Sequence, residues 1–311
     1  MSDDYLSNAK HDIRQWEHEG PSWLAQVGNL IFWPATKVAE QLIPDGVQEA
    51  VGKAIEAFLI GIGNLSNVTF DAAHVRERVA TELATFGESC DMWEQLAAAD
   101  RGAQHYWNWN LSYAAAEGCA AGAVGIIGLA ADIPALLTIA IRLIQQVSVC
   151  YGYDPTKPEE RDYVIHVLRT ASAGDIEAKL EAVIFLKQIE EILLKVAWKK
   201  MNAAFAAKKI SSLSLLAAVK QFAKSLGINL TKRKALQMVP IIGAVVGASF
   251  NATFINDIGR TAFMSYRRRW IAEREPPDGP VPANETSNPP PDFPGHSGAQ
   301  ADQRSTGDAE P

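Results

Sequence analysis

The stretch of sequence that decides the fold runs from residue 132 to residue 150 and reads DIPALLTIAIRLIQQVSVC. Apolar side chains fall on nearly every side of a helix drawn through it, which indicates a deeply buried helix rather than an amphipathic surface helix. Asp132 can accept hydrogen bonds from the exposed first-turn amides, and Pro134 loses no needed hydrogen bond near a helix start. The segment therefore predicts a core helix that begins close to residue 132.

Helical periodicity extends over most of the remaining chain. Apolar residues recur at three- and four-residue spacing in four further segments, at residues 45–65, 71–86, 175–196 and 212–226. Asp71 and Asp175 can cap two of these helices, and Gly227 can end the last one. No alternating β pattern bounded by hairpin turns is found. The sequence predicts an all-α, multi-helix bundle.

The C-terminal tail has a different composition. Between residues 275 and 311 there are nine prolines and seven acidic residues, but only one basic residue. Such a segment cannot bury enough apolar surface to offset the entropy of ordering itself. We therefore predict a single helical domain over residues 3–274, followed by a disordered, Pro-rich acidic tail over residues 275–311.

The overall composition, 48% hydrophobic and 21% charged, is that of a soluble globular protein. A net charge of −7 argues against nucleic-acid binding, because phosphates require a basic surface. The first eight residues lack the basic and apolar stretches of a secretory signal, and the three scattered cysteines form neither a disulfide framework nor a zinc motif. We expect a cytoplasmic protein with reduced thiols.

Two glycine-rich apolar segments, residues 114–150 and 238–266, are the most informative part of the chain. Glycine costs up to about 1 kcal/mol inside a helix, so repeated glycines need compensation, which close helix–helix approach supplies. The candidate helix-packing or membrane-facing positions are Gly118, Gly122, Gly125, Gly128, Gly243 and Gly247.

These segments allow three interpretations: a tightly packed soluble core, a shallow or conditional membrane hairpin, and a transmembrane span. The uncharged run from residue 119 to residue 131 is shorter than the roughly 20 residues that a spanning helix needs, which favours core packing. Aromatic residues at both ends resemble the belt found at membrane interfaces. The interpretation as a membrane hairpin therefore stays open. They are Tyr106, Trp107, Trp109 and Tyr113 before the run and Tyr151 and Tyr153 after it.

Charged residues supply two further candidate sites. Arg142 lies inside the apolar helix and needs an acidic partner, so a buried polar site formed by Glu117, Asp132, Arg142 and Asp257 is one candidate. Residues 195–274 carry fifteen basic side chains against two acidic ones. A solvated helix face or pairing with the acidic half explains such a charge, and the interleaved aromatics also suit anionic lipid headgroups. The candidate lipid contacts are Lys199, Lys200, Arg267, Arg268 and Arg269.

Familiar catalytic motifs are not found. The chain has no H-E-x-x-H zinc motif, no G-x-S-x-G nucleophile motif and no P-loop, and its six histidines are not placed at metal-ligand spacing. An all-α enzyme can still assemble a site from distant residues. We expect no cofactor, no metal and no catalytic residue.

Several segments resemble the EcsC family of bacterial proteins. The resemblance rests on residues 116–122, 132–137, 151–154, 239–247 and 260–262, together with Asn251. The family takes its name from an operon that encodes an ABC-type transporter, and the resemblance implies a circumstantial link to membranes but no catalytic residues.

The expected function is therefore that of a non-enzymatic protein, peripheral on the cytoplasmic face of a membrane. It would bind anionic lipid or a membrane protein such as an ABC-type transporter. Two alternatives stay open: an enzyme or small-molecule binder that uses the polar site, and a purely soluble interaction protein.

Overall fold

The computed structural model describes residues 2–20, 53, 55–57, 61, 70–87, 90–122, 129–173, 176–201 and 243–275. Within these ranges, residues 2–3, 118–122, 129–132, 176, 192–201 and 243–250 are described by their backbone alone. By its contacts the chain divides into two units, Met1–Glu275 and Pro276–Pro311. All of the helices below belong to the first unit.

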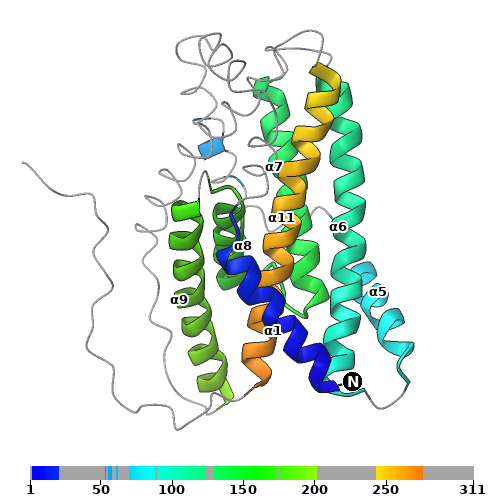
Figure 1. Ribbon diagram of the computed structural model, residues 1–311, viewed down its shortest axis with the longest axis vertical. Coiled ribbons are helices and arrows are strands. Elements are labelled where there is room, and N and C mark those ends of the chain that lie inside the picture. Colours follow the sequence, from blue (N-terminus) through cyan, green and yellow to red (C-terminus); the bar gives the residue numbers. More distant parts are fainter. Residues whose placement is uncertain are drawn as a thin grey trace, which may run out of the picture. The chain divides into compact units, whose positions relative to one another are not determined.

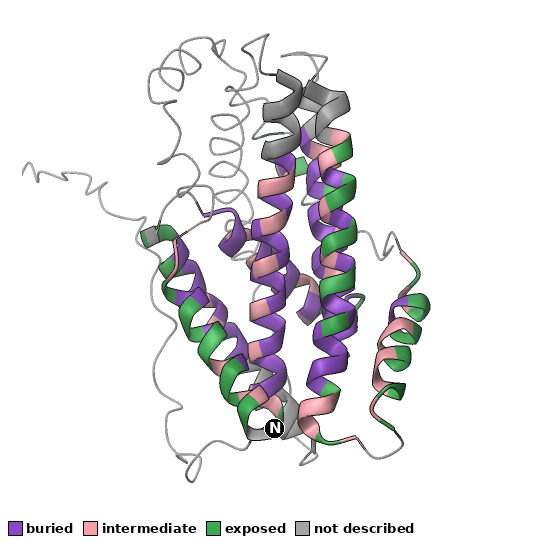
Figure 2. Ribbon diagram, turned by 45° about the vertical axis from the view of Figure 1, so that its right-hand side comes forward, coloured by how far each residue is buried: buried purple, intermediate pink, exposed green. Residues whose placement is uncertain are grey.

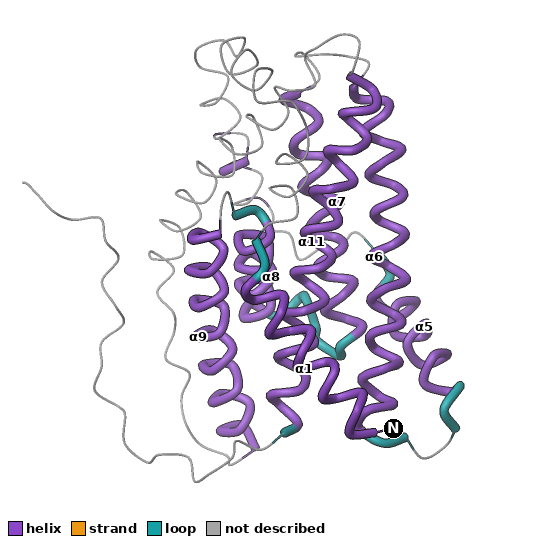
Figure 3. The backbone as a smooth tube through the Cα atoms, in the orientation of Figure 1, coloured by secondary structure: helices purple, strands orange, loops and turns teal. Residues whose placement is uncertain are grey.

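The longer elements of the described residues are helices, and these residues include no strand, which confirms the predicted all-α class (Figures 1 and 3). Their bounds are α1 Ser2–His18, α5 Ala72–Ala84, α6 Met92–Gly122, α7 Leu129–Cys150, α8 Pro158–Ala171, α9 Ile176–Met201 and α11 Gly243–Arg274.

The central helix of this bundle is α11. It contacts α1, α6, α7, α8 and α9, and its most extensive contact is with α6 (Figure 1). Along most of its described length its residues are buried or half-buried, so it has no broad solvent-facing side. A helix enclosed in this way has to satisfy its polar side chains within the protein.

Helices α6, α7 and α11 form a core in which α6 runs antiparallel to the other two (Figure 1). Gly259 of α11 lies against Trp107 of α6, and Asn110 of α6 donates a 2.7 Å hydrogen bond to Gln146 of α7. The C-terminal end of α6 and the N-terminal ends of α7 and α11 therefore lie together. We call this the glycine-rich end, residues 118–122, 129–132 and 243–250, and we call the opposite end of α11, around residues 267–269, the arginine end.

The predicted core helix is confirmed as α7. Leu137, Ala140, Ile144 and Val147 are fully buried, and they belong to one core cluster with residues of α6, α8 and α11 (Figure 2). Among the described residues, α7 is the one helix long and apolar enough to cross a membrane, and 72% of its stretch from Ile133 to Cys150 is buried inside the bundle. A buried helix of a soluble core has the same properties, so α7 in this arrangement agrees with the core interpretation.

Local sequence signals explain several helix ends. Asp71 caps α5 as predicted, because its side chain accepts a 2.8 Å hydrogen bond from the amide of Ala73. Helix α7 ends in a turn at Gly152, whose φ of 87° is a conformation that glycine adopts without a steric penalty. Pro158 then opens α8, where its missing N–H is not needed.

Some predicted elements fall outside the described residues. They are the helix over residues 212–226, the cap at Asp175 and the tail beyond residue 275. Within the helix predicted over residues 45–65, the described residues 53, 55–57 and 61 are helical.

Candidate functional site

Three consecutive arginines of α11 occupy the arginine end of the bundle. Successive residues of an α-helix are rotated by about 100°, so Arg267, Arg268 and Arg269 point in three different directions. Each one meets a carboxylate from a different neighbouring helix. The result is a set of ion pairs that surrounds α11.

Arg267 joins α11 to α6 and α1. Its guanidinium lies 2.9 Å from Asp100 of α6 and 3.2 Å from Asp12 of α1. Asp100 also accepts 2.6 Å hydrogen bonds from the hydroxyls of Tyr5 and Tyr151. Burial raises the pKa of Asp100, while Arg267 and the two hydroxyls oppose that rise. The site is a buried carboxylate with three donors.

Arg268 joins α11 to α9 and α1. It donates two hydrogen bonds, of 2.9 and 2.7 Å, to Glu190 and one of 2.7 Å to Glu17. The hydroxyl of Tyr163 donates to Glu190, and Lys187 donates to Glu17 at 2.7 Å. The forked contact with Glu190 is a strong form of charge-assisted hydrogen bond.

Arg269 joins α11 to α8. It donates two hydrogen bonds, of 2.9 and 2.6 Å, to Glu160 and one of 3.0 Å to Glu273. Its guanidinium lies 4.0 Å from the centre of the Tyr153 ring. Burial raises the pKa of Glu160, and Arg269 opposes that rise. The pair is almost completely enclosed.

The positions of these arginines correct the expectation that they contact anionic lipid. Only 7% of the Arg267 side chain, 12% of Arg268 and 7% of Arg269 is exposed, and each is paired inside the chain. Buried charges need partners of this kind because their own hydration has been lost. For Lys199 and Lys200 the backbone lies in α9, and their side chains are outside the described residues.

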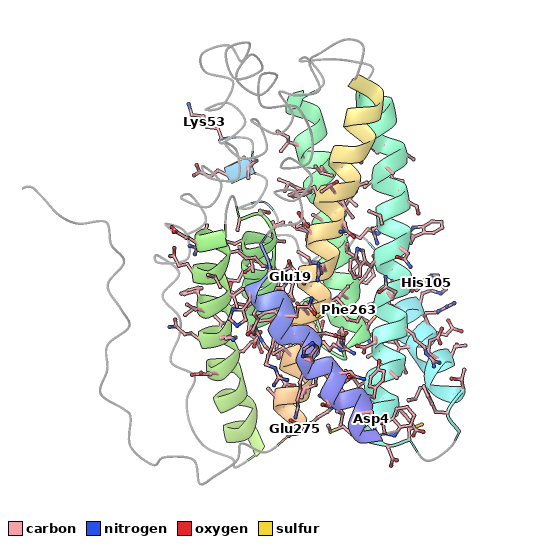
Figure 4. The ribbon with its side chains drawn as sticks, viewed as in Figure 1. Asp4, Glu19, Lys53, His105, Phe263 and Glu275 are labelled. Carbon is pink, nitrogen blue, oxygen red and sulfur yellow. The ribbon has the colours of Figure 1, made fainter. Side chains whose placement is uncertain are left out.

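A small pocket lies beside this network, where the ends of α1 and α8 meet the start of α9 and the middle of α11. The empty space in this region, counted together with the open solvent at the mouth of the pocket, is about 320 Å³. Lys179 donates to the backbone carbonyls of Trp16 and Glu19 at 2.8 and 2.6 Å. Arg260 lies 2.5 Å from Glu19, which Figure 4 labels at the C-terminal end of α1. Burial and the like charge of Arg260 lower the pKa of Lys179 to about 8, while the carboxylates of Glu19 and Asp257 oppose that shift. These contacts make Lys179 an anchor for the C-terminal end of α1.

The four residues of the predicted polar site are not brought to this pocket together. Asp257 borders it and interacts with Lys179, whereas Glu117 and Arg142 are half-buried on α6 and α7 and do not line it. Nε of Arg142 has no hydrogen-bond partner among the described residues. The side chain of Asp132 is outside the described residues.

The predicted glycine positions can be placed only in part. Gly118, Gly122, Gly243 and Gly247 lie in α6 and α11 with their surroundings undescribed, and the last two positions, Gly125 and Gly128, are outside the described residues. Their predicted role in packing or membrane contact stays a prediction.

Two other glycines do lie at close helix contacts. A Cβ at Gly259 would come within 2.3 Å of Trp107 Cδ1, and one at Gly102 would come within 2.7 Å of Val79 Cγ2. Neither of these two has another glycine three or four residues away, so the glycine spacing that marked the other positions does not identify them.

The acidic partners at the arginine end were not predicted from the sequence. The signal that could have found them is an acidic residue at a core position of a helical pattern: Asp100 follows the buried Ala97–Ala99, and Glu190 follows the buried Ile189. Their pairing with α11 depends on the tertiary fold.

The solvent-facing side of α6 is the most distinctive exposed part of the described residues. Trp109 is 62% exposed and Tyr113 is 57% exposed, which are large fractions for aromatic side chains. We call the exposed side-chain row that contains them the α6 outer face; its residues are Asn108, Trp109, Ser112, Tyr113 and Ala116. None of these residues is charged.

Comparison with known proteins gives one family and two relatives. The model of the EcsC protein family matches residues 7–271. The uncharacterised protein YdbA of Bacillus subtilis (strain 168) is 26% identical over 276 residues, which are 85% of this chain and 95% of that protein. Protein EcsC of the same organism is 26% identical over 241 residues, which are 76% of this chain and 84% of that protein. No solved structure matches.

Proposed function

Because the chain belongs to the EcsC protein family, and because its most exposed aromatic side chains lie on an uncharged helix face, we propose that it acts at the cytoplasmic face of a membrane. In this proposal it is a non-enzymatic helical protein, peripheral on the membrane. It contacts either lipid or a membrane protein such as an ABC-type transporter.

The observation that carries the proposal is the α6 outer face. Exposed Trp and Tyr are enriched at membrane–water interfaces and at the centres of protein–protein interfaces, where charged residues are depleted. The same helix continues into the glycine-rich end, where the sequence from residue 118 to residue 131 carries no charge. A surface of this kind favours an apolar or interfacial partner over bulk water.

The arrangement of the ionisable groups supports a non-enzymatic role. The carboxyls with raised pKa values at the arginine end, Asp100 and Glu160, are held by arginines that tie helices together. Structural ion-pair networks shift pKa values in the same way as active sites do. The alternative of a catalytic or ligand-binding polar site has less support, because only Asp257, among the three predicted residues whose side chains the structure describes, borders the pocket.

Fractionation of the native protein tests this proposal. We expect it to sediment with membranes, to stay there after a high-salt wash, and to be released by mild detergent, because the face that carries the contact is uncharged. Recovery of the protein entirely in the soluble fraction, from cells lysed without detergent, would contradict the proposal.

A further inference from the structure

We propose that the α6 outer face is a lipid-binding surface that enters the uncharged interfacial layer of a bilayer, and that this binding does not depend on anionic headgroups. This inference rests on the proposed function and names the surface and the lipid chemistry. It differs from the sequence-based expectation, in which basic side chains provided the attraction.

The first step is the geometry of the face. Trp109 and Tyr113 are four residues apart, so their side chains lie one helical turn apart on the same side of α6. Both are more than half exposed. Between Arg101 and Glu117 the chain has fifteen residues without Asp, Glu, Lys or Arg, which is about 20 Å of helix.

The second step concerns the polar groups of the face. Ser112 donates a 3.0 Å hydrogen bond to the carbonyl of Asn108, and the side-chain oxygen of Asn108 accepts one of 3.1 Å from Gln104. These neutral groups find partners on their own helix. They therefore need no complementary row of donors and acceptors, which a specific protein partner would normally supply.

The third step is the chemistry of the two aromatic side chains. Trp and Tyr combine a large apolar ring with one polar group, and this combination prefers the headgroup level of a bilayer. A helix that lies in the plane of the interface buries its apolar side by roughly 5–10 Å. The α6 outer face offers such a side, and it continues toward the uncharged sequence that follows residue 117.

The fourth step concerns the charges on and beside the α6 outer face. The arginines of α11 are neutralised inside the bundle, and Arg101 at the edge of the face pairs with Glu82 of α5. No cation of the described residues lies on the α6 outer face. Apart from Arg101, which pairs with Glu82, the described residues therefore place no arginine or lysine at this face to attract anionic lipid.

The chain offers a matched control on α9. Leu180 and Ile184 are also exposed and four residues apart, but exposed acidic residues, Glu177 and Glu181, flank them. An acidic border disfavours lipid contact, so the same loss of apolar area there should not change binding.

Vesicle flotation of the full-length protein tests the inference. For wild type we expect similar bound fractions, within about twofold, on pure phosphatidylcholine and on vesicles that also contain phosphatidylglycerol, at low and at high salt. Trp109→Ala/Tyr113→Ala should reduce the bound fraction on the order of tenfold, because it removes two large interfacial side chains. Leu180→Ala/Ile184→Ala should stay within about twofold of wild type.

A second measurement separates loss of contact from loss of fold. Thermal melting by circular dichroism should be unchanged in the Trp109→Ala/Tyr113→Ala protein, because both side chains are exposed. Brominated phosphatidylcholine should quench the tryptophan fluorescence of wild type more strongly than that of Trp109→Phe. Equal quenching would place Trp109 away from lipid and overturn the inference.

Other outcomes also decide. The lipid-binding inference would be overturned by binding to anionic vesicles alone, or by unchanged binding of Trp109→Ala/Tyr113→Ala. It would also be overturned if wild type formed a dimer in solution and this double variant were a monomer. If wild type ignores all vesicles but still sediments with native membranes, the lipid surface is overturned and the proposed function stands through a membrane-protein partner. If it does neither, both proposals fail.

Discussion

The two ends of the α6–α7–α11 core differ in where their charged side chains lie. At the arginine end, three cations of α11 are enclosed and each is matched by a carboxylate from another helix. On the α6 outer face, nearer the glycine-rich end, Trp109 and Tyr113 are exposed and no residue is charged. The difference teaches that the three adjacent arginines of α11 serve contacts inside the bundle, and that the surface for which we propose a partner is the uncharged one.

Breaking the arginine end should have the largest effect. Arg269→Gln leaves Glu160 buried without its forked partner, and removing one member of a buried pair costs about 3–5 kcal/mol of unfolding free energy. Denaturant unfolding followed by circular dichroism measures this loss. The double variant Glu160→Leu/Arg269→Met should be more stable than either single change, because it removes both buried charges. A loss below about 1 kcal/mol for Arg269→Gln would mean that the pair is solvated and not enclosed.

The close contact between α6 and α11 should give the next largest effect. Gly259→Ala places a methyl group against the Trp107 ring, and overpacking of this kind costs about 1–3 kcal/mol. The effect should shrink in a Trp107→Leu background, where the ring is gone. Gly61→Ala is the matched control, since nothing lies within 4 Å of a Cβ there, and it should leave stability unchanged or raise it by up to about 1 kcal/mol. Equal costs at both positions would show that the helix contact is loose.

The pH dependence of the unfolding free energy tests a further buried ionisable group, His166. Burial, with Arg169 as a like charge, lowers the pKa of His166 from 6.5 to about 4. Between these values the unfolded chain binds a proton that the folded chain does not, so stability falls as the pH drops from 6.5 toward 4. Asp100 and Glu160, whose pKa values are raised, contribute with the opposite sign.

Those carboxylates are present in wild type and in His166→Gln alike, so their contribution cancels in the difference. Wild type should lose about 1–2 kcal/mol more than His166→Gln between pH 7 and pH 5. Denaturant unfolding at the two pH values measures it, and identical losses would mean that the ring is protonated in the folded protein.

The smallest effect is expected at an exposed ion pair. Lys10 and Glu275 lie 2.6 Å apart, but both side chains are substantially exposed. Lys10→Gln should therefore change the unfolding free energy by less than about 0.5 kcal/mol, and high salt should abolish the difference. A loss as large as that of Arg269→Gln would erase the contrast between enclosed and exposed charges.

Much of the fold follows from local sequence. The apolar pattern identified α7 as a core helix, and Asp71 marked the start of α5, because helix periodicity and capping depend on residues a few positions apart. The family could be recognised in the same way, since its segments are short and contiguous.

The direction of the arginines could not be predicted in this way. The triplet beside Tyr266 and Trp270 looks like a lipid contact when α11 is considered alone, but Tyr266 and Trp270 are themselves buried. Glu190 and Glu160 lie 78 and 109 residues away from their arginines along the chain. Local pattern carries no information on pairs so far apart, and the same limit applies to the contact of Gly259 with Trp107.

The three adjacent arginines of α11 limit which insertions and deletions this chain can accept during evolution. Deleting or inserting one residue between Arg260 and Arg267 would rotate everything downstream by about 100° and turn all three guanidiniums away from their carboxylates at once. A substitution on α11 changes the contacts of one side chain, whereas a change of length in that interval moves all three arginines together. Variation in chain length should therefore accumulate in the connecting loops and spare this helix.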